Sequence, residues 1–503
     1  MIREKFYITT PIYYVNASPH IGHSYTNIAA DTLSRYMRQV LGDKNVWFLT
    51  GTDEHGQKIQ KAADEAKLNP QEFVDKVVVQ FKNLWKKLNI SNNDFIRTTE
   101  KRHIHFLRQA LTKLYINKDI YQAEYEGWYC TPCETFWTET QVSGQLCPDC
   151  KRPLEKISET NYFFKLKKHQ AWLIKYIEDN PDFIRPENRR NEVLSFLKAN
   201  ELNDLCISRP KARLSWGIPL PFSPEHVTYV WFDALINYIS AVGSFDKDGN
   251  YQSDWWPADL NLIGKDILRQ HAVYWPIMLR ALDIPPPRAV FAHGWWMIDE
   301  NKMSKSRGNV VSPLEMVDKF GIDVYRYFLL RDVPFGMDGN FSEEAIIKRF
   351  NGDLANDLGN LVYRTLTMVE KYYQGNIPEV TVICGQQGQK IEEKIMALPQ
   401  EVSQALSGPS DFNFSLALSS IWELINLANK YIEETKPWNL AKENKTVELK
   451  NFIGLLVKVI RVLAKMIAPF MPQTAQVISE QIGEAKIHKG KPLFPRIDLK
   501  PKS

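Results

Sequence analysis

An apolar run joined by one short turn to an amphipathic repeat constrains the fold more than any other stretch of this sequence. Residues 6–15 are mostly apolar or aromatic, which is typical of a buried β-strand. From Tyr25 to Val40, apolar residues recur at steps of three and four until Gly42, which predicts a helix that ends there. Strand-like and helix-like stretches alternate up to residue 114 and again after residue 228. We therefore predict an α/β fold, a Rossmann-like doubly wound parallel sheet that an insert splits in two.

Two cysteine pairs lie in the interrupting region. Cys130-Thr-Pro-Cys133 and Cys147-Pro-Asp-Cys150 are C-x-x-C motifs with thirteen residues between them. Four thiolates at this spacing can close a tetrahedron around zinc and leave no position for water, so the motif predicts one structural Zn²⁺. A thioredoxin-like redox pair is the alternative, but it explains one C-x-x-C motif and not two. Such a zinc knuckle would fix a loop-rich insert that cannot bury a core of its own.

Two short motifs carry the candidate chemistry. His20-Ile21-Gly22-His23 lies where the first strand turns into a helix, and the N–H groups and dipole of a helix start favour an anion. Gly22 lets a flat ligand approach the backbone, and each imidazole can donate to phosphate oxygens. Far downstream, Lys302-Met303-Ser304-Lys305-Ser306 supplies a cationic loop. Alone, the histidines could merely cap the turn and the lysines could form a solvated loop, but the pair favours a phosphate site.

This pair of motifs resembles the signature of class I aminoacyl-tRNA synthetases, and nearly the whole chain is similar to the methionine enzymes of that class. The resemblance implies that the chain activates methionine with ATP to methionyl-adenylate and transfers it to the 3′-terminal adenosine of tRNA(Met). Such chemistry depends on positioning and positive charge rather than on covalent help from the protein. It implies Mg²⁺ carried by ATP. It also implies catalytic roles for His20, His23, Lys302 and Lys305.

The resemblance assigns further residues to three binding sites. For ATP they are His20, Gly22, His23, Gly264, Asp266, His293, Gly294, Lys302 and Lys305. For methionine they are Ile12, Tyr14, Asp53, Trp231, Ala234, Leu235, Tyr238, Ile267 and His271. For the anticodon they are Asn360, Arg364 and Trp438.

These assignments make physical sense. A carboxylate can pair with the substrate ammonium group, aromatic rings can contact a polarizable thioether, and a tyrosine hydroxyl or His271 could donate weakly to sulfur. An amide and a guanidinium can read base edges while an indole stacks on a base. Without the resemblance, the pocket aromatics would be interpreted as core and the anticodon residues as a cap, a surface arginine and a packed tryptophan. Pro11-Ile12-Tyr13 differs from the alanine-leucine-proline of some relatives, which leaves the exact pocket wall open.

The chain of 503 residues is too long for one hydrophobic core, and we predict four segments. Residues 1–114 and 229–340 would be the two halves of the catalytic domain, the second with the lysine loop. Residues 115–228 would be the insert with the zinc knuckle, and residues 341–503 a helical anticodon-binding bundle. Within them, Asn69-Pro70-Gln71-Glu72 has the cap, proline and glutamate of a helix start.

The insert also argues against class I enzymes for several other amino acids. Enzymes for valine, isoleucine and leucine need a second, hydrolytic site, and a segment largely occupied by a zinc knuckle leaves little room for one. A cysteine enzyme would need a zinc with an open position. The rivals that remain are another class I enzyme for a small side chain and a catalytically idle tRNA-binding paralogue.

Composition is ordinary for a globular protein. The formal charge of +4 permits a nucleic-acid partner without requiring one. Charges lead directly into the first strand, so we expect no signal peptide, and residues 452–471 are interrupted by Lys458, Arg461 and Lys465, which predicts a bundle helix and no membrane span. Paired thiols suit a reducing compartment, so we expect a cytoplasmic protein. The chain ends soon after the predicted bundle, and we expect a monomer.

Overall fold

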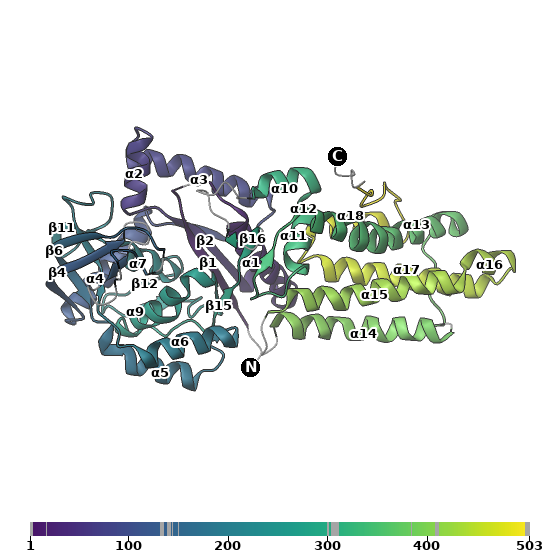
Figure 1. Ribbon diagram of the computed structural model, residues 1–503. Helices are drawn as coiled ribbons and strands as arrows, with labels where there is room; N and C mark the ends of the chain where they lie inside the picture. Colours follow the sequence, from purple (N-terminus) through teal and green to yellow (C-terminus); the bar gives the residue numbers. More distant parts are fainter. Residues whose placement is uncertain are drawn as a thin grey trace. The chain divides into compact units, whose positions relative to one another are not determined.

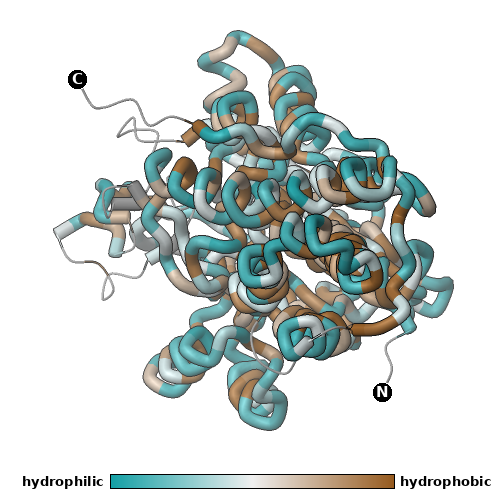
Figure 2. The backbone as a smooth tube through the Cα atoms, turned by 90° about the vertical axis from the view of Figure 1, so that its right-hand side faces the viewer, coloured by the Kyte–Doolittle hydropathy of each residue, from teal (hydrophilic) through white to brown (hydrophobic). Residues whose placement is uncertain are grey.

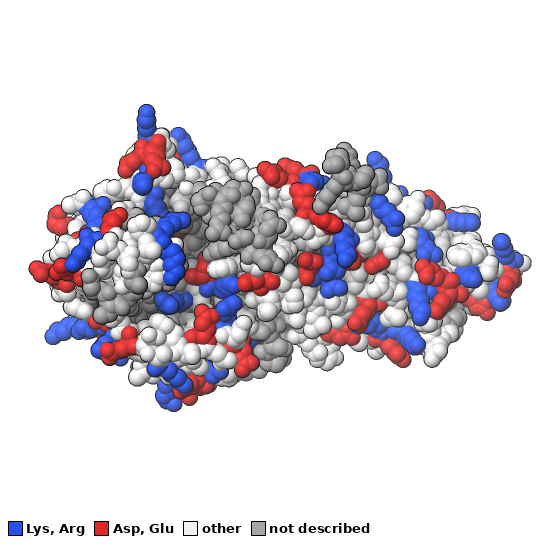
Figure 3. All heavy atoms as spheres, viewed as in Figure 1, with Lys and Arg blue, Asp and Glu red and all other residues white. Residues whose placement is uncertain are grey.

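The computed structural model describes residues 4–16, 18–130, 135–137, 142, 144–148, 150–298, 301–302, 311–383, 385–407 and 412–497. The chain forms two compact units, residues 1–293 and 294–503 (Figure 1). The four segment boundaries predicted from the sequence stay predictions. On the face shown in Figure 3, cationic and anionic side chains are interspersed over both units, in keeping with the small net charge.

The first unit is built on a parallel sheet. Among the described residues, its strands lie in the order β3-β2-β1-β14-β15-β7, and every neighbouring pair is parallel. The strands are β1 (Phe6–Tyr14), β2 (Val46–Asp53), β3 (Asp94–Arg97), β7 (Ile184–Arg185), β14 (Leu260–Gly264) and β15 (Val290–His293). The chain runs outward from β1 in one direction through β2 and β3, and later in the other through β14 and β15. The carboxyl ends of β1 and β14 therefore meet at a topological switch point, where open α/β sheets bind ligands. The predicted doubly wound parallel sheet is confirmed.

The helices of this unit follow the predicted alternation. Asn69 Oδ1 accepts a hydrogen bond from the Glu72 N–H at 2.9 Å, so the predicted helix start after Asn69 is confirmed. The α-helices are α1 (Ile21–Leu41), α2 (Gln57–Glu65), α3 (Pro70–Lys87), α4 (Lys101–Ile116), α5 (Gln170–Asp179), α6 (Glu187–Ala199), α7 (Val230–Leu235), α8 (Asn237–Ser240) and α9 (Trp275–Ala281). A 3₁₀ turn (Lys265–Ile267) and a π-helical segment (Gln270–Tyr274) connect β14 to α9. One continuous apolar core joins the helices from α4 to α9 to the sheet.

Antiparallel strands interrupt the alternation. A sheet in the order β5-β4-β6-β8 contains the long pairing of β4 with β6, from Ile120 opposite Phe164 to Tyr129 opposite Glu155. Its strands are β4 (Ile120–Cys130), β5 (Thr135–Trp137), β6 (Glu155–Phe164) and β8 (Leu205–Cys206). Smaller sheets are formed by β9 (Ser208–Pro210), β10 (Pro219–Leu220) and β11 (Ser223–Thr228), and by β12 (Gly243–Phe245) and β13 (Tyr251–Ser253). Strand β7 comes from the same stretch of sequence but forms an edge of the parallel sheet.

The second unit is mainly helical. A small sheet of β16 (Trp296–Ile298), β17 (Asn301–Lys302) and β18 (Gly339–Asn340) precedes the bundle. The α-helices are α10 (Pro313–Phe320), α11 (Ile322–Arg331), α12 (Glu343–Arg349), α13 (Asn360–Tyr373), α14 (Gly385–Ser407), α15 (Phe414–Thr435), α16 (Pro437–Lys442), α17 (Thr446–Ile467) and α18 (Pro472–Ile482), with a π-helical segment (Phe350–Gly359) before α13. Hydrophobic and hydrophilic residues alternate along the bundle helices (Figure 2), which is the pattern of amphipathic packing.

Helix α17 tests the interpretation of the most apolar stretch. Lys458, Arg461 and Lys465 are exposed, whereas Phe452, Leu456 and most of the other apolar residues of the helix are buried. The predicted bundle helix is therefore confirmed. Among the residues that the structure describes, no helix is long and apolar enough to cross a membrane.

Candidate functional site

The two histidines of the first motif cap helix α1. His20 is the N-cap residue in extended backbone, and its Nδ1 accepts a hydrogen bond from the Gly22 N–H at 3.1 Å. Conversely, Nδ1 of His23 accepts one from the His20 N–H at 3.2 Å. The two rings stack with centroids 3.9 Å apart and an interplanar angle of 24°. Two imidazoles thus form a reciprocal capping box of the kind that serine and glutamate usually make.

This cap fixes the tautomer of both rings. Because Nδ1 accepts a backbone N–H in each ring, the neutral form of each imidazole carries its proton on Nε2. Both rings are only half-buried. Capping and anion binding were alternatives in the sequence, but here they use different nitrogens of the same ring. The start of α1 can therefore be held by Nδ1 while Nε2–H donates to an anion at the positive end of the helix dipole.

A hydrogen-bonded chain ties the start of α1 to the sheet. The Thr26 hydroxyl donates to the Gly22 carbonyl at 3.1 Å, and its oxygen lies 2.7 Å from Nε2 of His293. His293 ends β15 and pairs with Gly264, the last residue of β14. A Cβ on Gly264 would lie 2.6 Å from Oδ1 of Asp266, so the carboxylate occupies the space that a side chain would need. Six predicted ATP residues therefore lie at the start of α1 or just at the ends of β14 and β15: His20, Gly22, His23, Gly264, Asp266 and His293.

The remaining predicted ATP residues belong to the second unit. Gly294 follows β15, and a Cβ there would lie 2.2 Å from the Met337 carbonyl oxygen, so only glycine fits. The backbone of Lys302 lies in β17. The side chain of Lys302 and the whole of Lys305 lie outside the described residues.

Predicted methionine residues lie on four segments of the first unit: β1, the end of β2, the helices α7 and α8, and the connection from β14 to α9. Ile12 and Tyr14 are on β1, and Tyr14 pairs with Asp53 at the end of β2. Asp53 is buried, with 5% of its surface exposed. The predicted residues Ala234, Leu235 and Tyr238 on α7 and α8 are also buried, whereas Trp231 is half-buried. Leu235 and Tyr238 belong to the continuous apolar core, and Ile12 and Ile267 pack against it.

Tyr238 and His271 form a closed pair. His271 Nδ1 lies 2.9 Å from the Ile267 carbonyl oxygen, which can only accept, so the ring proton is on Nδ1. Nε2 then accepts from the Tyr238 hydroxyl at 2.7 Å. Burial lowers the pKa of His271 to about 4, against the opposing influence of the Ile267 hydrogen bond and of Asp266. The ring is neutral at physiological pH, and both protons of the pair are used within the protein, so neither is directed at a substrate sulfur in this geometry.

A buried hydrogen-bonded cluster around Asp233 joins two of these segments, and the sequence analysis did not single it out. Asp233 on α7 accepts from Nδ1 of His55 and from Nε2 of His103, both at 2.7 Å. Burial raises the pKa of Asp233, but the charge of His55 and the hydrogen bonds of both histidines outweigh it and lower that pKa to about 2. The signal in the sequence was the string Thr52-Asp53-Glu54-His55, a run of polar residues at the end of a buried strand.

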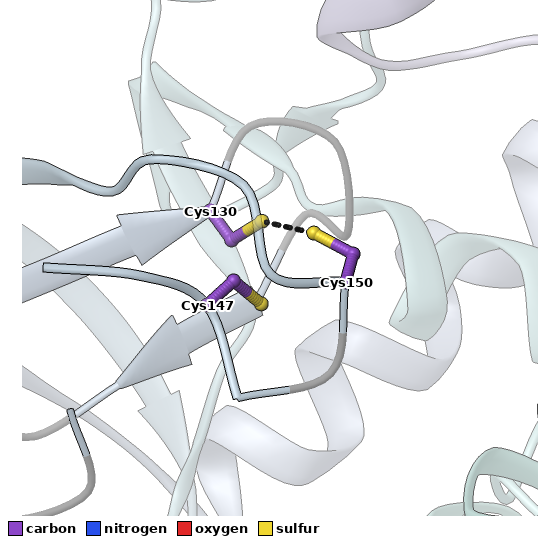
Figure 4. Close-up of side chains that lie close together, drawn as sticks. All are labelled: Cys130, Cys147 and Cys150. Carbon is purple, nitrogen blue, oxygen red and sulfur yellow. Dashed lines mark hydrogen bonds between the residues drawn. The ribbon is translucent and has the colours of Figure 1, made fainter. Parts of the chain in front are cut away.

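Three predicted metal ligands come together. The Sγ atoms of Cys130, Cys147 and Cys150 lie within 4.8 Å of one another, and those of Cys130 and Cys150 are 3.5 Å apart (Figure 4). Ligands of a tetrahedral zinc at about 2.3 Å are separated by about 3.8 Å, so this spacing fits a metal ion. The cluster could therefore hold one. Cys133, the fourth predicted ligand, lies outside the described residues.

The predicted anticodon residues lie on the bundle surface or at its margin. Asn360 begins α13 and is exposed, and Arg364, one turn further, is half-buried. Trp438 on α16 is 44% exposed, so it is not the packed core residue of the alternative interpretation. The end of α13 and the segment around α16 line a groove of about 390 Å³ that includes Tyr372 and Leu440.

Comparisons with known proteins agree with this arrangement. Residues 6–156 and 153–366 match the family model of tRNA synthetases class I (M), and residues 389–499 match the anticodon-binding domain of tRNA ligase. The chain is 48% identical to the methionine–tRNA ligase of Caldanaerobacter subterraneus subsp. tengcongensis over 99% of this chain and 80% of that protein. It is also 48% identical to the methionine–tRNA ligase of Clostridium acetobutylicum, over 99% of this chain and 79% of the relative.

A solved structure is similar over almost the same length. Mycobacterium tuberculosis methionyl-tRNA synthetase in complex with methionyl-adenylate superposes with a TM-score of 0.92 at 38% identity, covering 98% of this chain and 100% of that one. Sequence, family model and fold thus agree over both units, and the resemblance inferred from the two motifs is confirmed. The chain belongs to the methionine–tRNA ligase family of class I tRNA synthetases.

Proposed function

We infer that this chain is a methionine–tRNA ligase, which activates methionine with ATP to methionyl-adenylate and then transfers it to the 3′-terminal adenosine of tRNA(Met). The observation that carries this conclusion is the agreement with the methionyl-adenylate complex over nearly the whole chain, with a TM-score of 0.92. In the first step a carboxylate oxygen of methionine attacks the α-phosphorus of ATP. The bond to the β-phosphate breaks, and pyrophosphate leaves.

We assign the ATP triphosphate to the start of α1. His20 and His23 donate from Nε2 to phosphate oxygens, while their Nδ1 atoms hold the helix start. Lys302 and Lys305 stabilise the negative charge that grows on the leaving pyrophosphate, because cations that bind the transition state more tightly than the ground state raise the rate. Mg²⁺ carried by ATP would supply further charge neutralisation.

We assign the methionine to the segments around Asp53. The Asp53 carboxylate binds the substrate ammonium group, and Trp231 and Tyr238 contact the thioether. Because the Tyr238 proton is donated to His271, the tyrosine presents its lone pairs and ring edge rather than a proton. The pocket would then select methionine through shape and polarizability more than through a hydrogen bond to sulfur. Ile12, Tyr14, Ala234 and Leu235 complete its wall with Ile267.

We propose that Zn²⁺ is the metal of the cysteine cluster and that Cys133 is its fourth ligand. Four thiolates leave no open position, so the ion would stabilise the β4–β6 region and take no part in the reaction. Free thiols in such a cluster persist in a reducing compartment, and we place the protein in the cytoplasm.

We propose that the bundle reads the anticodon of tRNA(Met). An exposed amide at Asn360 and the guanidinium of Arg364 lie one helical turn apart on α13, and the exposed indole of Trp438 supplies a stacking surface. A monomer is the assembly that we expect, and sedimentation would measure it.

Pyrophosphate exchange with each of the twenty amino acids tests this function. We expect exchange with methionine at a kcat/KM at least a hundredfold above that of any other natural amino acid. Exchange with a different amino acid would favour another class I enzyme, and none with any would favour an idle tRNA-binding paralogue. Lys305→Ala should lower kcat by orders of magnitude with little change in methionine affinity. An unchanged kcat with a large loss of methionine affinity would contradict the role of Lys305.

A further inference from the structure

The cluster around Asp233 connects three separate segments through buried hydrogen bonds. His55 comes from the loop after β2, His103 from α4 and Asp233 from α7. The side chains of Asp233 and His103 are 0% exposed and that of His55 is 6% exposed. Nδ1 of His103 also lies 2.9 Å from Oγ of Ser240 on α8. A carboxylate at the centre of two imidazole donors is well satisfied, so the cluster fixes the separation of these segments closely.

The segments that carry His55 and Asp233 each contain proposed methionine residues. Asp53 lies two positions before His55, and Trp231 and Ala234 flank Asp233 in α7. Helix α7 has only six residues, so its position depends on side-chain contacts more than on its own hydrogen bonds. The bond between His55 and Asp233 therefore links the wall that would bind the ammonium group to the wall that would contact the thioether.

The loop is held on its opposite flank as well. Between Asp53 and His55, the buried carboxylate of Glu54 accepts two hydrogen bonds from Arg97 on β3, at 2.7 and 2.9 Å. The Thr52 hydroxyl donates to the same carboxylate at 2.7 Å. Glu54 is thus anchored to β3 and His55 to α7, and Asp53 directly precedes these two residues.

We propose that Asp233, with His55 and His103, is a positioning cluster for the methionine pocket, which sets the distance between Asp53 and the wall formed by α7. This inference rests on the proposed function, because it concerns the methionine site of that reaction. In this proposal the cluster acts through Asp53 and α7 and not by contact with the substrate. Its loss should change methionine binding more than ATP binding, since its described hydrogen bonds join His55, His103, Asp233 and Ser240, and none of these is a predicted ATP residue.

The test compares Asp233→Asn with a matched control, Asp259→Asn, in methionine-dependent pyrophosphate exchange. Asparagine keeps the size of aspartate but replaces one acceptor oxygen with a donor, so only one of the two imidazole N–H groups can be accepted. We expect the methionine KM to rise at least tenfold while the ATP KM stays within twofold. Asp259 is a buried carboxylate at the amino ends of β1 and β14, where it accepts the Tyr7 N–H. Asp259→Asn should leave both KM values within twofold.

A second pair of variants separates positioning from packing. The side-chain amide of glutamine can place a donor where His103 has Nε2, whereas leucine has none. His103→Leu should reproduce the rise in methionine KM, and His103→Gln should return it to within about threefold of wild type. A rescue that depends on one donor distinguishes positioning from general loss of packing, and this pair decides the question if Asp233→Asn does not fold.

The outcomes are distinct. Wild-type methionine KM in Asp233→Asn, a parallel rise of both KM values, or equal effects of leucine and glutamine at His103 would overturn the positioning role while the enzyme remains a methionine–tRNA ligase. A wild-type protein with no methionine-dependent exchange would refute the proposed function, and this inference with it.

Discussion

Acid should destabilise the first unit through one buried imidazole, that of His271. The ring is 2% exposed, and burial lowers its pKa to about 4. In the unfolded chain a histidine has a pKa of about 6.5. Between these two values the unfolded chain binds a proton that the native ring does not, so the free energy of unfolding falls as the pH falls through this window. Above pH 6.5 the penalty is absent.

The size of the effect follows from the shift. A difference of about 2.5 pKa units corresponds to about 3 kcal/mol once the pH is below both values. At pH 5 the unfolded histidine is almost fully protonated and the native one is still mostly neutral, so about 2 kcal/mol of this is already lost relative to pH 8. For a unit of this size, that loss corresponds to a fall of roughly 3 °C in Tm.

The variant His271→Gln removes the titrating group and keeps an acceptor for the Tyr238 hydroxyl. Scanning calorimetry at pH 8 and pH 5 should therefore show a smaller fall in the Tm of the first unit for His271→Gln than for wild type, by roughly 3 °C. His105→Gln, on the exposed face of α4, is the matched control and should fall as wild type does. If His271→Gln and wild type lose the same Tm between these pH values, the neutral buried ring is the wrong description of this site.

Three further predictions address the cap, the metal cluster and the bundle. His20→Asn keeps an acceptor for the Gly22 N–H but lacks the Nε2 donor. The Tm should therefore change little, while kcat of pyrophosphate exchange falls about a hundredfold or more. A lower Tm with an unchanged kcat would contradict this division of roles between Nδ1 and Nε2. Cys147→Ser should lower both the Tm and the zinc content, which atomic absorption measures, whereas the control Cys206→Ser should lower neither. Equal zinc content in the two variants would argue against the cysteine cluster as the metal site. Trp438→Ala should raise the KM for tRNA in aminoacylation about tenfold or more and spare pyrophosphate exchange. An equal loss of both activities would contradict a role of this indole in tRNA binding alone.

Local chemistry made part of this structure predictable from the sequence. The turn into α1, the helix start after Asn69 and the gathering of cysteines depend on residues close together in the chain, and each has a spacing with one favoured geometry. The bonds of Asp233 could not be predicted in this way. Its partners lie 178 and 130 positions away, and only the tertiary fold brings them together.

The position of the proton on each histidine ring could not be predicted from the sequence either, because it depends on which hydrogen bond each ring nitrogen makes. In His20 and His23, Nδ1 accepts a backbone N–H, which leaves the proton on Nε2. In His271, Nδ1 faces a carbonyl, which puts the proton there and makes Nε2 an acceptor. The same residue type thus supplies donors at the start of α1 and none towards the proposed thioether site. A site that must bind a triphosphate needs the first arrangement, whereas a pocket for an uncharged side chain needs a ring without spare charge.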